Sequence, residues 1–237
     1  YRQLKSKDRK EIDNGFVLEA TNRILDLLDR SNQKITFFSL GEVFEWYPNL
    51  FEKIFAAGHE LAYHSHSHRK IESDEVMRKE LLSSREFIQE FKPIGFRAPN
   101  IFMPNIALGP LEKNGFLYSS SIYGSYSDKV ESRQGKLKEF PVSTYTYSHR
   151  DRKILNYPRP LKMSMLKNEL PIGSGYFLAL LPSRLISIII DRLTERNEPV
   201  VMFLHNWQIF PPTESSFPNL SYKLAHPTYF PYTLSLK

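Results

Sequence analysis

The feature that most constrains the fold is the alternation of helical and strand patterns along the chain. Phe16–Arg30 has apolar residues at helical spacing, and Lys34–Leu40 after it is rich in the β-branched and aromatic residues of strands. Glu42–Ala57 is again helical and ends at Gly58, and Glu60–Tyr63 is typical of a short strand. Strands separated by single helices predict an α/β fold with a parallel sheet.

The alternation continues along the rest of the chain. Ser73 is the expected cap of a further helix, and Gly95–Ala98 has the pattern of a short strand ended by proline. Pro104–Asn114 and Leu180–Arg196 are helical in pattern, and Val200–Leu204 is an apolar strand pattern. This order favours a (β/α) barrel, in which residues at the carboxyl ends of the strands carry the chemistry.

Two segments depart from the regular order. Ser119–Arg159 is rich in Ser, Tyr and Lys, and we interpret it as a long excursion around one face with a strand at Leu137–Val142. The residues after Pro211 are rich in proline and aromatic residues, and we expect them to be coil packed on the body. Because we find neither a repeat nor a low-complexity linker, residues 1–237 are expected to form a single domain.

Composition and charge exclude several classes of protein. The chain has no cysteine, which excludes disulfides, thiolate zinc sites and cysteine nucleophiles, so any metal must be held by His, Asp or Glu. The net charge of +6 is diffuse and is not paired with a series of aromatic side chains, which argues against a nucleic-acid partner. Since apolar runs are short, we expect no transmembrane segment. The compartment and the oligomeric state stay open.

The densest chemical signal is a group of histidines around the strand that ends at Tyr63. Four of the 7 histidines of the chain lie between His59 and His68. Imidazole is the commonest neutral nitrogen ligand for zinc and related ions. His64 and His66 would share one face of a strand, whereas His64 and His68 would converge if the chain turns after His64. Spacing alone leaves both pairs open, and it also leaves open a group of hydrogen-bonded surface histidines.

With their neighbours, these histidines resemble the polysaccharide deacetylase family, the NodB-homology carbohydrate esterases. The resemblance extends over about Val17 to Phe210 and begins with Thr36-Phe-Phe38, Gly58-His-Glu60 and His64-Ser65-x-x-His68. The last of these motifs supplies two ligands to a divalent metal in that family, usually zinc, which implies His64 and His68 as ligands. The resemblance also implies that Ser65 braces the turn and that the fold is a distorted (β/α) barrel with seven strands.

A second motif, Arg97-Ala-Pro99-Asn100, follows in the order that the family has. The resemblance implies that Arg97 orients a catalytic aspartate, for which its fixed charge and fork of donors are suited. It implies that Asn100 offers its backbone N–H to an oxyanion. Pro99 is expected to lie against the substrate. Taken alone, this motif would be better explained by a plain turn with a salt bridge, but it follows the histidine motif in the family's order.

A third motif is the apolar strand that ends in Leu204 and His205. The resemblance implies that His205 is the general acid that protonates the leaving amine, a task for a ring that titrates near neutrality. Trp207 and Tyr176 are candidates for stacking on a sugar ring, although either could equally be a core aromatic residue. The chain is similar here to a subgroup with His-x-Trp at this point, and it shares two more of its motifs: Gly173-Ser-Gly-Tyr-Phe177 and Glu139-Phe-Pro141.

The chain departs from the family at the first motif, an aspartate-rich strand end that supplies the general base and the third metal ligand. Nothing before the Phe16–Arg30 helix matches it, and Asp8 and Asp13 lie in charged surroundings without a strand pattern. The sequence starts at Tyr1 rather than at Met, and we favour the explanation that the first strand lies upstream of it. The other explanation is a protein that has lost the aspartates and its hydrolytic activity.

The sequence therefore predicts a zinc-dependent hydrolase that removes N-acetyl groups from a polysaccharide or oligosaccharide. Metal-activated water would attack the acetyl group, and a free amino sugar would leave. One alternative is hydrolysis of another non-peptide C–N bond, such as that of a cyclic amide or a ureide. A further alternative is a catalytically inactive, carbohydrate-binding homologue.

Overall fold

The computed structural model describes residues 4–130, 137–147 and 153–210. Its helices are α1 (Ser6–Asp13), α2 (Phe16–Ser31), α3 (Gly41–Trp46), α4 (Pro48–Ala56), α5 (Asp74–Ser83), α6 (Arg85–Phe91), α7 (Leu108–Lys113), α8 (Gly175–Leu180), α9 (Ser183–Glu195) and α10 (Asn206–Ile209). Its strands are β1 (Thr36–Ser39), β2 (Glu60–Tyr63), β3 (Gly95–Phe96), β4 (Tyr118–Ser119), β5 (Tyr123–Gly124), β6 (Lys129–Val130), β7 (Lys138–Glu139), β8 (Val142–Ser143), β9 (Tyr145–Thr146), β10 (Ile154–Leu155) and β11 (Glu169–Leu170). The coil predicted after Pro211 lies outside the described residues.

The centre of the fold is a sheet of five strands in the order β1-β2-β3-β4-β7. Every pairing in this sheet is parallel, and the strands lie in the order of the chain, although β5 and β6 come between β4 and β7 in the sequence. The predicted α/β fold with a parallel sheet is therefore confirmed. Because parallel strands place their carboxyl ends at one edge, the segments after Tyr63, Phe96, Ser119 and Glu139 emerge together.

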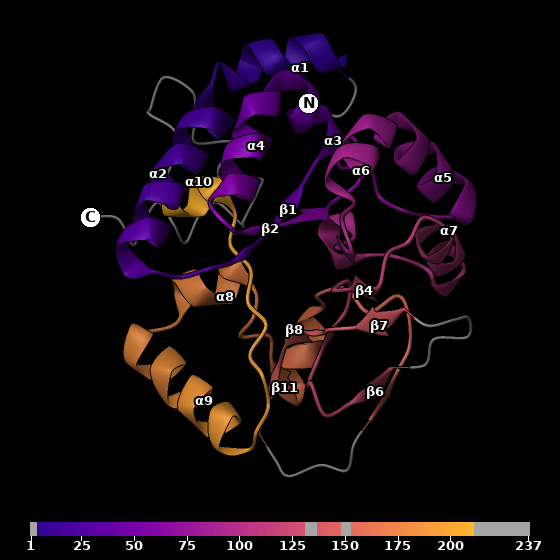
Figure 1. Cartoon of the computed structure of the whole chain (residues 1–237). Helices are drawn as coiled ribbons and strands as arrows, with labels where there is room; N and C mark the ends of the chain where they lie inside the picture. The colour runs from indigo at the N-terminus through magenta and orange to yellow at the C-terminus, as the bar shows by residue number, and fades with distance from the viewer. Residues whose placement is uncertain (1–3, 131–136, 148–152, 211–237) are drawn as a thin grey trace.

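Helices of the first half of the chain cover the first strands of the sheet. Figure 1 shows α2 and α4 beside β1 and β2, with α5, α6 and α7 gathered farther along the sheet. The short helix α10 returns from the end of the described chain to lie against α2. Within the described ranges, no helix is long and apolar enough to cross a bilayer.

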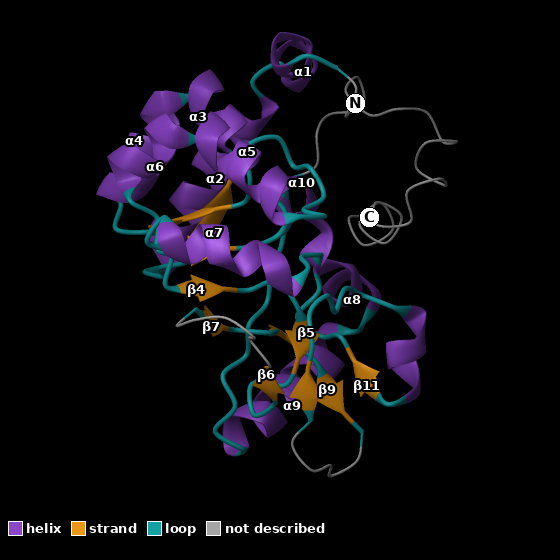
Figure 2. Ribbon diagram, turned by 90° about the vertical axis from the view of Figure 1, so that its right-hand side faces the viewer, coloured by secondary structure: helices purple, strands orange, loops and turns teal. Residues whose placement is uncertain are grey.

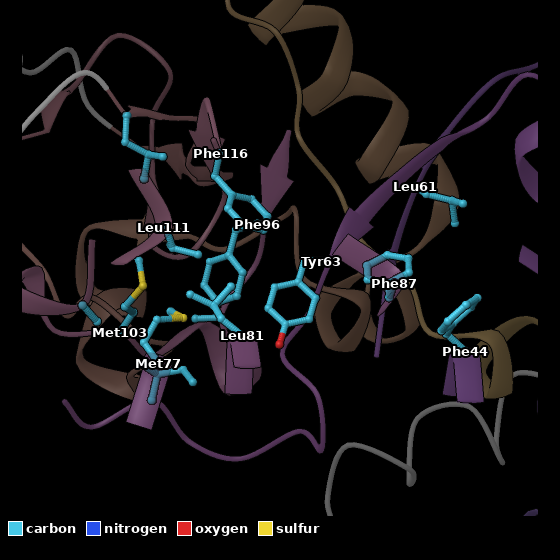
Figure 3. Close-up of a cluster of buried hydrophobic side chains, with 14 of the residues drawn as sticks. Phe44, Leu61, Tyr63, Met77, Leu81, Phe87, Phe96, Met103, Leu111 and Phe116 are labelled. Atoms are coloured by element: carbon cyan, nitrogen blue, oxygen red, sulfur yellow. The ribbon is translucent and has the colours of Figure 1, made fainter. Parts of the chain in front are cut away.

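The main hydrophobic core lies between the strands β2 and β3 and these helices. Figure 3 shows Tyr63 and Phe96 side by side in it, and their ring centroids are 5.8 Å apart. Phe87 joins them from α6, with its ring centroid 6.1 Å from that of Tyr63. All three side chains are at most 1% exposed. Burial of this many aromatic rings fixes the ends of β2 and β3 relative to each other.

The later part of the chain forms small ladders beside the main sheet. In Figure 2, β5, β6, β9 and β11 lie together below β4 and β7. The ladders are β5 with β8 and β6 with β10, both parallel, and β9 with β11, which is antiparallel. Helix α9 packs its buried Ile189 and Leu193 against Tyr145 and Ile172. The predicted excursion after Ser119 is thus a group of short strands.

Proline explains two differences between the predicted and observed elements. The helix predicted at Glu42–Ala57 is divided into α3 and α4 at Pro48, because the residue before a proline avoids the helical conformation. The strand predicted at Leu137–Val142 is divided into β7 and β8 at Pro141, which has no N–H for a ladder. In contrast, Ser73 caps α5 as predicted, since its hydroxyl accepts the N–H of Val76 at 3.2 Å.

The prediction of a buried strand at Val200–Leu204 is wrong in its details. Only Phe203 forms a bridge, to Ser174, and the carbonyl of Val201 accepts the N–H of Ser143 at 3.0 Å. Met202 and Leu204 are 42% and 48% exposed. Among the described residues the segment has backbone partners on one side, which is too little to form a regular strand.

Gly173 fits where two backbone segments approach each other most closely. A Cβ at this position would lie 2.4 Å from the carbonyl oxygen of Val201 and 2.7 Å from the nitrogen of Ser143. We expect Gly173→Ala to lower the free energy of unfolding by about 1–3 kcal/mol, because neither backbone can yield easily. Urea unfolding followed by circular dichroism measures it. The exposed Ser187→Ala on α9 is the control, and equal stabilities of the two variants would contradict the prediction.

Candidate active site

His64 lies directly after β2, and its ring contacts the residue after β3. The backbone N–H of His64 donates to the carbonyl of Ser39 at 2.8 Å, which continues the pairing of β2 with β1. Its Nδ1 lies 2.6 Å from the carbonyl oxygen of Arg97. A carbonyl oxygen only accepts hydrogen bonds, so Nδ1 carries the proton and Nε2 keeps its lone pair. This arrangement is the usual outer-sphere support of a metal-ligating histidine.

The turn after His64 decides which histidine is its neighbour. Ser65 and His68 have φ values of 72° and 58°, in the left-handed region, and the N–H of His68 donates to the hydroxyl of Ser65 at 3.1 Å. The turn places the rings of His64 and His68 with centroids 5.0 Å apart and planes at 71°. His66 faces elsewhere, with Nδ1 at 3.2 Å from the Ser84 hydroxyl. Of the two pairs that spacing left open, His64 and His68 are the one brought together.

The protein environment keeps His64 neutral. Desolvation is the largest effect, and with the neighbouring His68, Arg97 and His205 it places the pKa of His64 well below its ordinary value. The hydrogen bond to the Arg97 carbonyl opposes this shift only in part. Because a metal binds the neutral imidazole, a lowered pKa favours coordination over protonation near neutral pH.

Arg97 is a buried guanidinium held between aromatic rings. It is 6% exposed, and its charged carbon lies 4.1 Å from the ring centroid of Phe38 and 5.3 Å from that of Phe203. Its Nε and Nη2 donate to the carbonyl and hydroxyl of Ser120 at 3.0 and 2.7 Å. Burial lowers its pKa to about 10. In the described part of the chain no carboxylate forms an ion pair with Arg97, so the salt bridge of the simple-turn alternative is not present there.

Glu139 organises the residues that hold Arg97. Its carboxylate accepts the N–H groups of Ser121 and Ile122 at 2.6 and 3.2 Å, and the hydroxyl of Tyr157 in a short hydrogen bond. Burial raises the pKa of Glu139, while these donors lower it. Ser121 in turn accepts the N–H of Ala98, beside Arg97. The sequence drew attention to the motif of Glu139 without a role for it, because its partners are distant in the chain.

His205 follows residues 200–204, and its ring contacts two aromatic side chains. Its ring centroid is 5.6 Å from that of Phe203 and 5.2 Å from that of Trp207, with which it stacks at 18°. Nδ1 lies 3.0 Å from the amide oxygen of Gln208, which also accepts the His205 backbone N–H. Desolvation of the ring is the main cause of a lowered pKa, and the charge of Arg97 lowers it further. This leaves Nε2 for contacts in the groove.

These residues meet in a groove of about 860 Å³. Its walls include His64, His68, Arg97 and His205, so the structure brings four of the predicted site residues together. The rest of the groove is largely apolar and is lined by the inner face of α2, by β1 and by residues 200–206. Strand β1 is the edge of the main sheet, with β2 as its partner within the described ranges. The groove therefore runs along an open sheet edge.

The other predicted site residues do not line this groove. Pro99 is buried, and Asn100 next to it is exposed with φ 57° in a short 3-10 turn. Asn100 has no acceptor for its N–H within the described residues. Tyr176 is half-buried on α8 against Phe177, and Trp207 stacks on His205 as described above.

The histidine pair has no third ligand within reach in the described ranges. No group of three His, Asp or Glu residues suited to a metal is found there. The acidic residue that lies closest to the histidine motif in space is Glu80, whose buried carboxylate contacts the loop of His66 and Ser67 and not the rings of the pair. Sequence reasoning missed Glu80, although an acidic residue at a core-facing position between Met77 and Leu81 of a helix is a recognisable signal.

Comparison with protein families divides the chain in two. Residues 12–119 match the model of the polysaccharide deacetylase family. Residues 120–232 match the model of a domain of unknown function, DUF3473. The boundary falls inside the site, since Arg97 lies in the first part, and Ser120 and His205 lie in the second.

Two curated proteins are similar to parts of this chain. A peptidoglycan-N-acetylglucosamine deacetylase of Bacillus cereus is 39% identical over 79 residues, which cover 32% of this chain and 28% of that protein. A peptidoglycan deacetylase-like protein of Gibberella zeae, FGM2, is 29% identical over 136 residues, covering 54% of this chain and 39% of that protein. The chain thus spans well under half the length of either relative. A crystal structure from Mycobacterium smegmatis, described as a proposed polysaccharide deacetylase, is 32% identical with a TM-score of 0.48 and covers 52% of this chain and 46% of that one.

The lowered pKa of His64 predicts that acid destabilises the metal-free protein. Below pH 6.5, the ordinary pKa of histidine, His64 binds a proton in the unfolded state but not in the folded state. The free energy of unfolding therefore falls as pH falls. In the presence of a metal chelator, we expect His64→Gln to reduce the change of the free energy of unfolding with pH, between pH 7 and 5, by up to about 1.4 kcal/mol per pH unit. Urea titrations at several pH values measure it, and an unchanged slope would show that His64 titrates normally.

Proposed function

We propose that this chain is a metal-dependent hydrolase that removes N-acetyl groups from a carbohydrate, because residues 12–119 match the model of the polysaccharide deacetylase family. The observation that carries the proposal is the pair His64 and His68, with the His64 Nδ1 hydrogen-bonded to the Arg97 carbonyl. Both curated relatives are named as peptidoglycan deacetylases or as similar to them, which supports an N-acetylated glycan as the substrate class.

The histidine pair fits a zinc ion in its chemistry. The lone pair of Nε2 on His64 is available, the ring is neutral, and His68 lies beside it in the same groove. His64 and His68 would hold the metal, with a carboxylate as the third ligand. When bound there, zinc polarises an acyl oxygen and lowers the pKa of a water molecule. In the reaction, a hydroxyl joins the acetyl carbon, a proton joins the amine nitrogen, and acetate and a free amino sugar leave.

His205 is the proposed general acid for the leaving amine. Its Nδ1 is directed to Gln208, so Nε2 is the atom that would hold and deliver the proton in the groove. Desolvation and the charge of Arg97 keep its pKa low, which opposes this role. A carboxylate between Arg97 and His205 would offset both effects and raise the pKa of His205. The acid role therefore depends on an anion in the groove.

The same anion would stabilise the charge of Arg97. Arg97 is a buried cation whose hydrogen bonds within the described residues go to neutral acceptors of Ser120, and such a charge is costly without a carboxylate in direct contact. We propose that a strand from upstream of Tyr1 lies in the groove between β1 and Val200–Leu204. It would close the sheet into a distorted seven-stranded barrel and bring the general base and the third metal ligand. The open edge of β1 and the apolar groove walls support this proposal.

Substrate contacts are proposed around the mouth of this site. Trp207 stacks on His205, so its indole adjoins the proposed acid and could support a sugar ring. Tyr176 and Pro99 are proposed as further contacts. The N–H of Asn100, which has no acceptor in the described part of the chain, is the proposed donor to the oxyanion.

One observation favours a second function, a carbohydrate-binding homologue without hydrolytic activity. Neither a third metal ligand nor a carboxylate partner for Arg97 is present within the described ranges. If no upstream strand supplies them, the groove would keep its sugar contacts and lose its base. The two functions differ in one measurable product, free acetate.

The metal assignment is tested in a chain extended upstream of Tyr1, by acetate release from N-acetylglucosamine oligomers with added zinc. We expect His64→Ala to abolish acetate release and to weaken zinc binding by at least about tenfold, because it removes a ligand. His66→Ala is the matched control from the same loop, since its ring contacts Ser84 rather than the pair, and it should keep both properties. Full activity of His64→Ala would exclude the pair as the metal site.

The upstream strand is tested by extending the chain with the coding sequence that precedes Tyr1. We expect the extended chain to bind zinc at least about tenfold more tightly than residues 1–237 and to release acetate, because it adds the third ligand and the base. Arg97→Met should lose this gain in activity, since the methionine cannot orient a carboxylate. Equal zinc affinity and no acetate release in the extended chain would favour the carbohydrate-binding alternative.

A further inference from the structure

The loop that joins His64 to His68 has a conformation that it would not keep by itself. Ser65 and His68 both have positive φ values, which are unfavourable for residues with a Cβ. Such a backbone persists only where surrounding groups hold it. His64 is fixed by β2 and by the Arg97 carbonyl, so the separation of the two rings depends on the four residues that follow.

Glu80, on α5, forms several of the hydrogen bonds that hold this loop. Its Oε2 accepts the backbone N–H groups of His66 and of Ser67, each at 2.9 Å. Its Oε1 accepts the hydroxyl of Ser67 at 3.1 Å. The residue is 6% exposed, and no ion pair involves it within the described residues. A buried carboxylate without a cation is stabilised by just such charge-assisted hydrogen bonds.

The position of Glu80 is itself fixed by the core. The hydroxyl of Tyr63, the last residue of β2, donates to the Glu80 carbonyl at 2.7 Å and contacts the Ser84 hydroxyl at 3.0 Å. Tyr63 is fully buried. The strand that precedes His64 and the helix that holds the loop are thus tied together one residue before the proposed site.

The other side of the loop is held by the start of α3. The N–H groups of Gly41 and Glu42 donate to the carbonyls of Ser65 and His66, each at 3.1 Å. These donors bind the carbonyls of the loop, whereas Glu80 binds its N–H groups. The backbone N–H groups of His66 and Ser67 therefore both depend on the Glu80 side chain as their acceptor.

We propose that Glu80 is a positioning residue that presets the ring of His68 beside that of His64 for metal binding. The inference rests on the proposed metal site and adds a residue that the histidine motif does not contain. Glu80 contacts neither ring, so it acts through the backbone of His66 and Ser67. Removing an outer residue of this kind costs about 10–100-fold in metal affinity.

The chain offers a conservative and a matched control variant. In Glu80→Gln, the amide oxygen can still accept both N–H groups, and the amide NH₂ can donate to the Ser67 hydroxyl. Glu80→Ala removes all of these contacts. Glu75→Ala, on the same helix, changes an exposed residue whose partner is Lys79 at 2.7 Å. If Glu80 only stabilised helix α5, its substitution would lower the free energy of unfolding and leave amide exchange of the loop unchanged.

The experiment measures zinc affinity, by competition with a chromophoric chelator, and amide hydrogen exchange of residues 64–68 in the zinc-free protein. We expect Glu80→Ala to bind zinc about 10–100-fold more weakly and to exchange the amides of His66 and Ser67 faster. Glu80→Gln should stay close to the unchanged protein in both measurements, and Glu75→Ala should not differ from it. If Glu80→Ala fails to fold, Ser67→Ala, which loses one of the three contacts, replaces it with a smaller expected loss of affinity.

Each outcome decides between the two levels of the proposal. Unchanged zinc affinity in Glu80→Ala, with faster loop exchange, would overturn the positioning role. Equal amide hydrogen exchange of residues 64–68 in Glu80→Ala and the unchanged protein would show that Glu80 does not hold the loop. If the unchanged protein and His64→Ala bind zinc equally poorly, the proposed metal site fails and the role of Glu80 toward it fails with it, whatever the exchange rates show of the loop.

Discussion

The hydrogen bond between the His64 ring and the Arg97 carbonyl is the interaction on which the site depends. It joins the first residue after β2 to the first residue after β3, two neighbours at the carboxyl edge of the parallel sheet. At 2.6 Å it fixes both the orientation of the ring and the nitrogen that carries the proton. The pairing of β2 with β3 and the aromatic core beneath them place these two residues within reach. The chemistry of one motif is therefore set by the backbone of another.

Three buried charged side chains lie in this part of the structure, and they differ in how their charges are stabilised. Glu80 and Glu139 each accept several N–H and O–H groups, so both carboxylates are stabilised without a cation. Arg97 donates to Ser120 and lies on aromatic rings, and the charge of Glu139 acts on it from a distance, but it forms no ion pair among the described residues. The charge without an ion-pair partner is thus positive and borders the groove. An acidic segment in the groove would relieve it and would also supply what the histidine pair lacks.

The two family models meet inside this network. The first part ends at Ser119, yet the acceptors of Arg97 belong to Ser120, and Glu139 and Tyr157 hold the following residues in place. His205, also from the second part, shares the groove with His64. The region of unknown function therefore forms part of the wall of the candidate site, which gives it a structural role beside any further one.

The sequence by itself determined the parallel α/β order, the positions of the early strands to within a few residues and the chemical character of the motifs, because periodicity and residue type are local properties. It also indicated that an aspartate motif was missing. Tertiary structure decided that His68 and not His66 lies beside His64, since the choice depends on a turn with two left-handed residues held by Glu80. It likewise decided that, among the described residues, residues 200–204 have backbone partners on one side and Arg97 lies buried without an ion pair. These outcomes depend on contacts between residues distant in the chain, which no local pattern records.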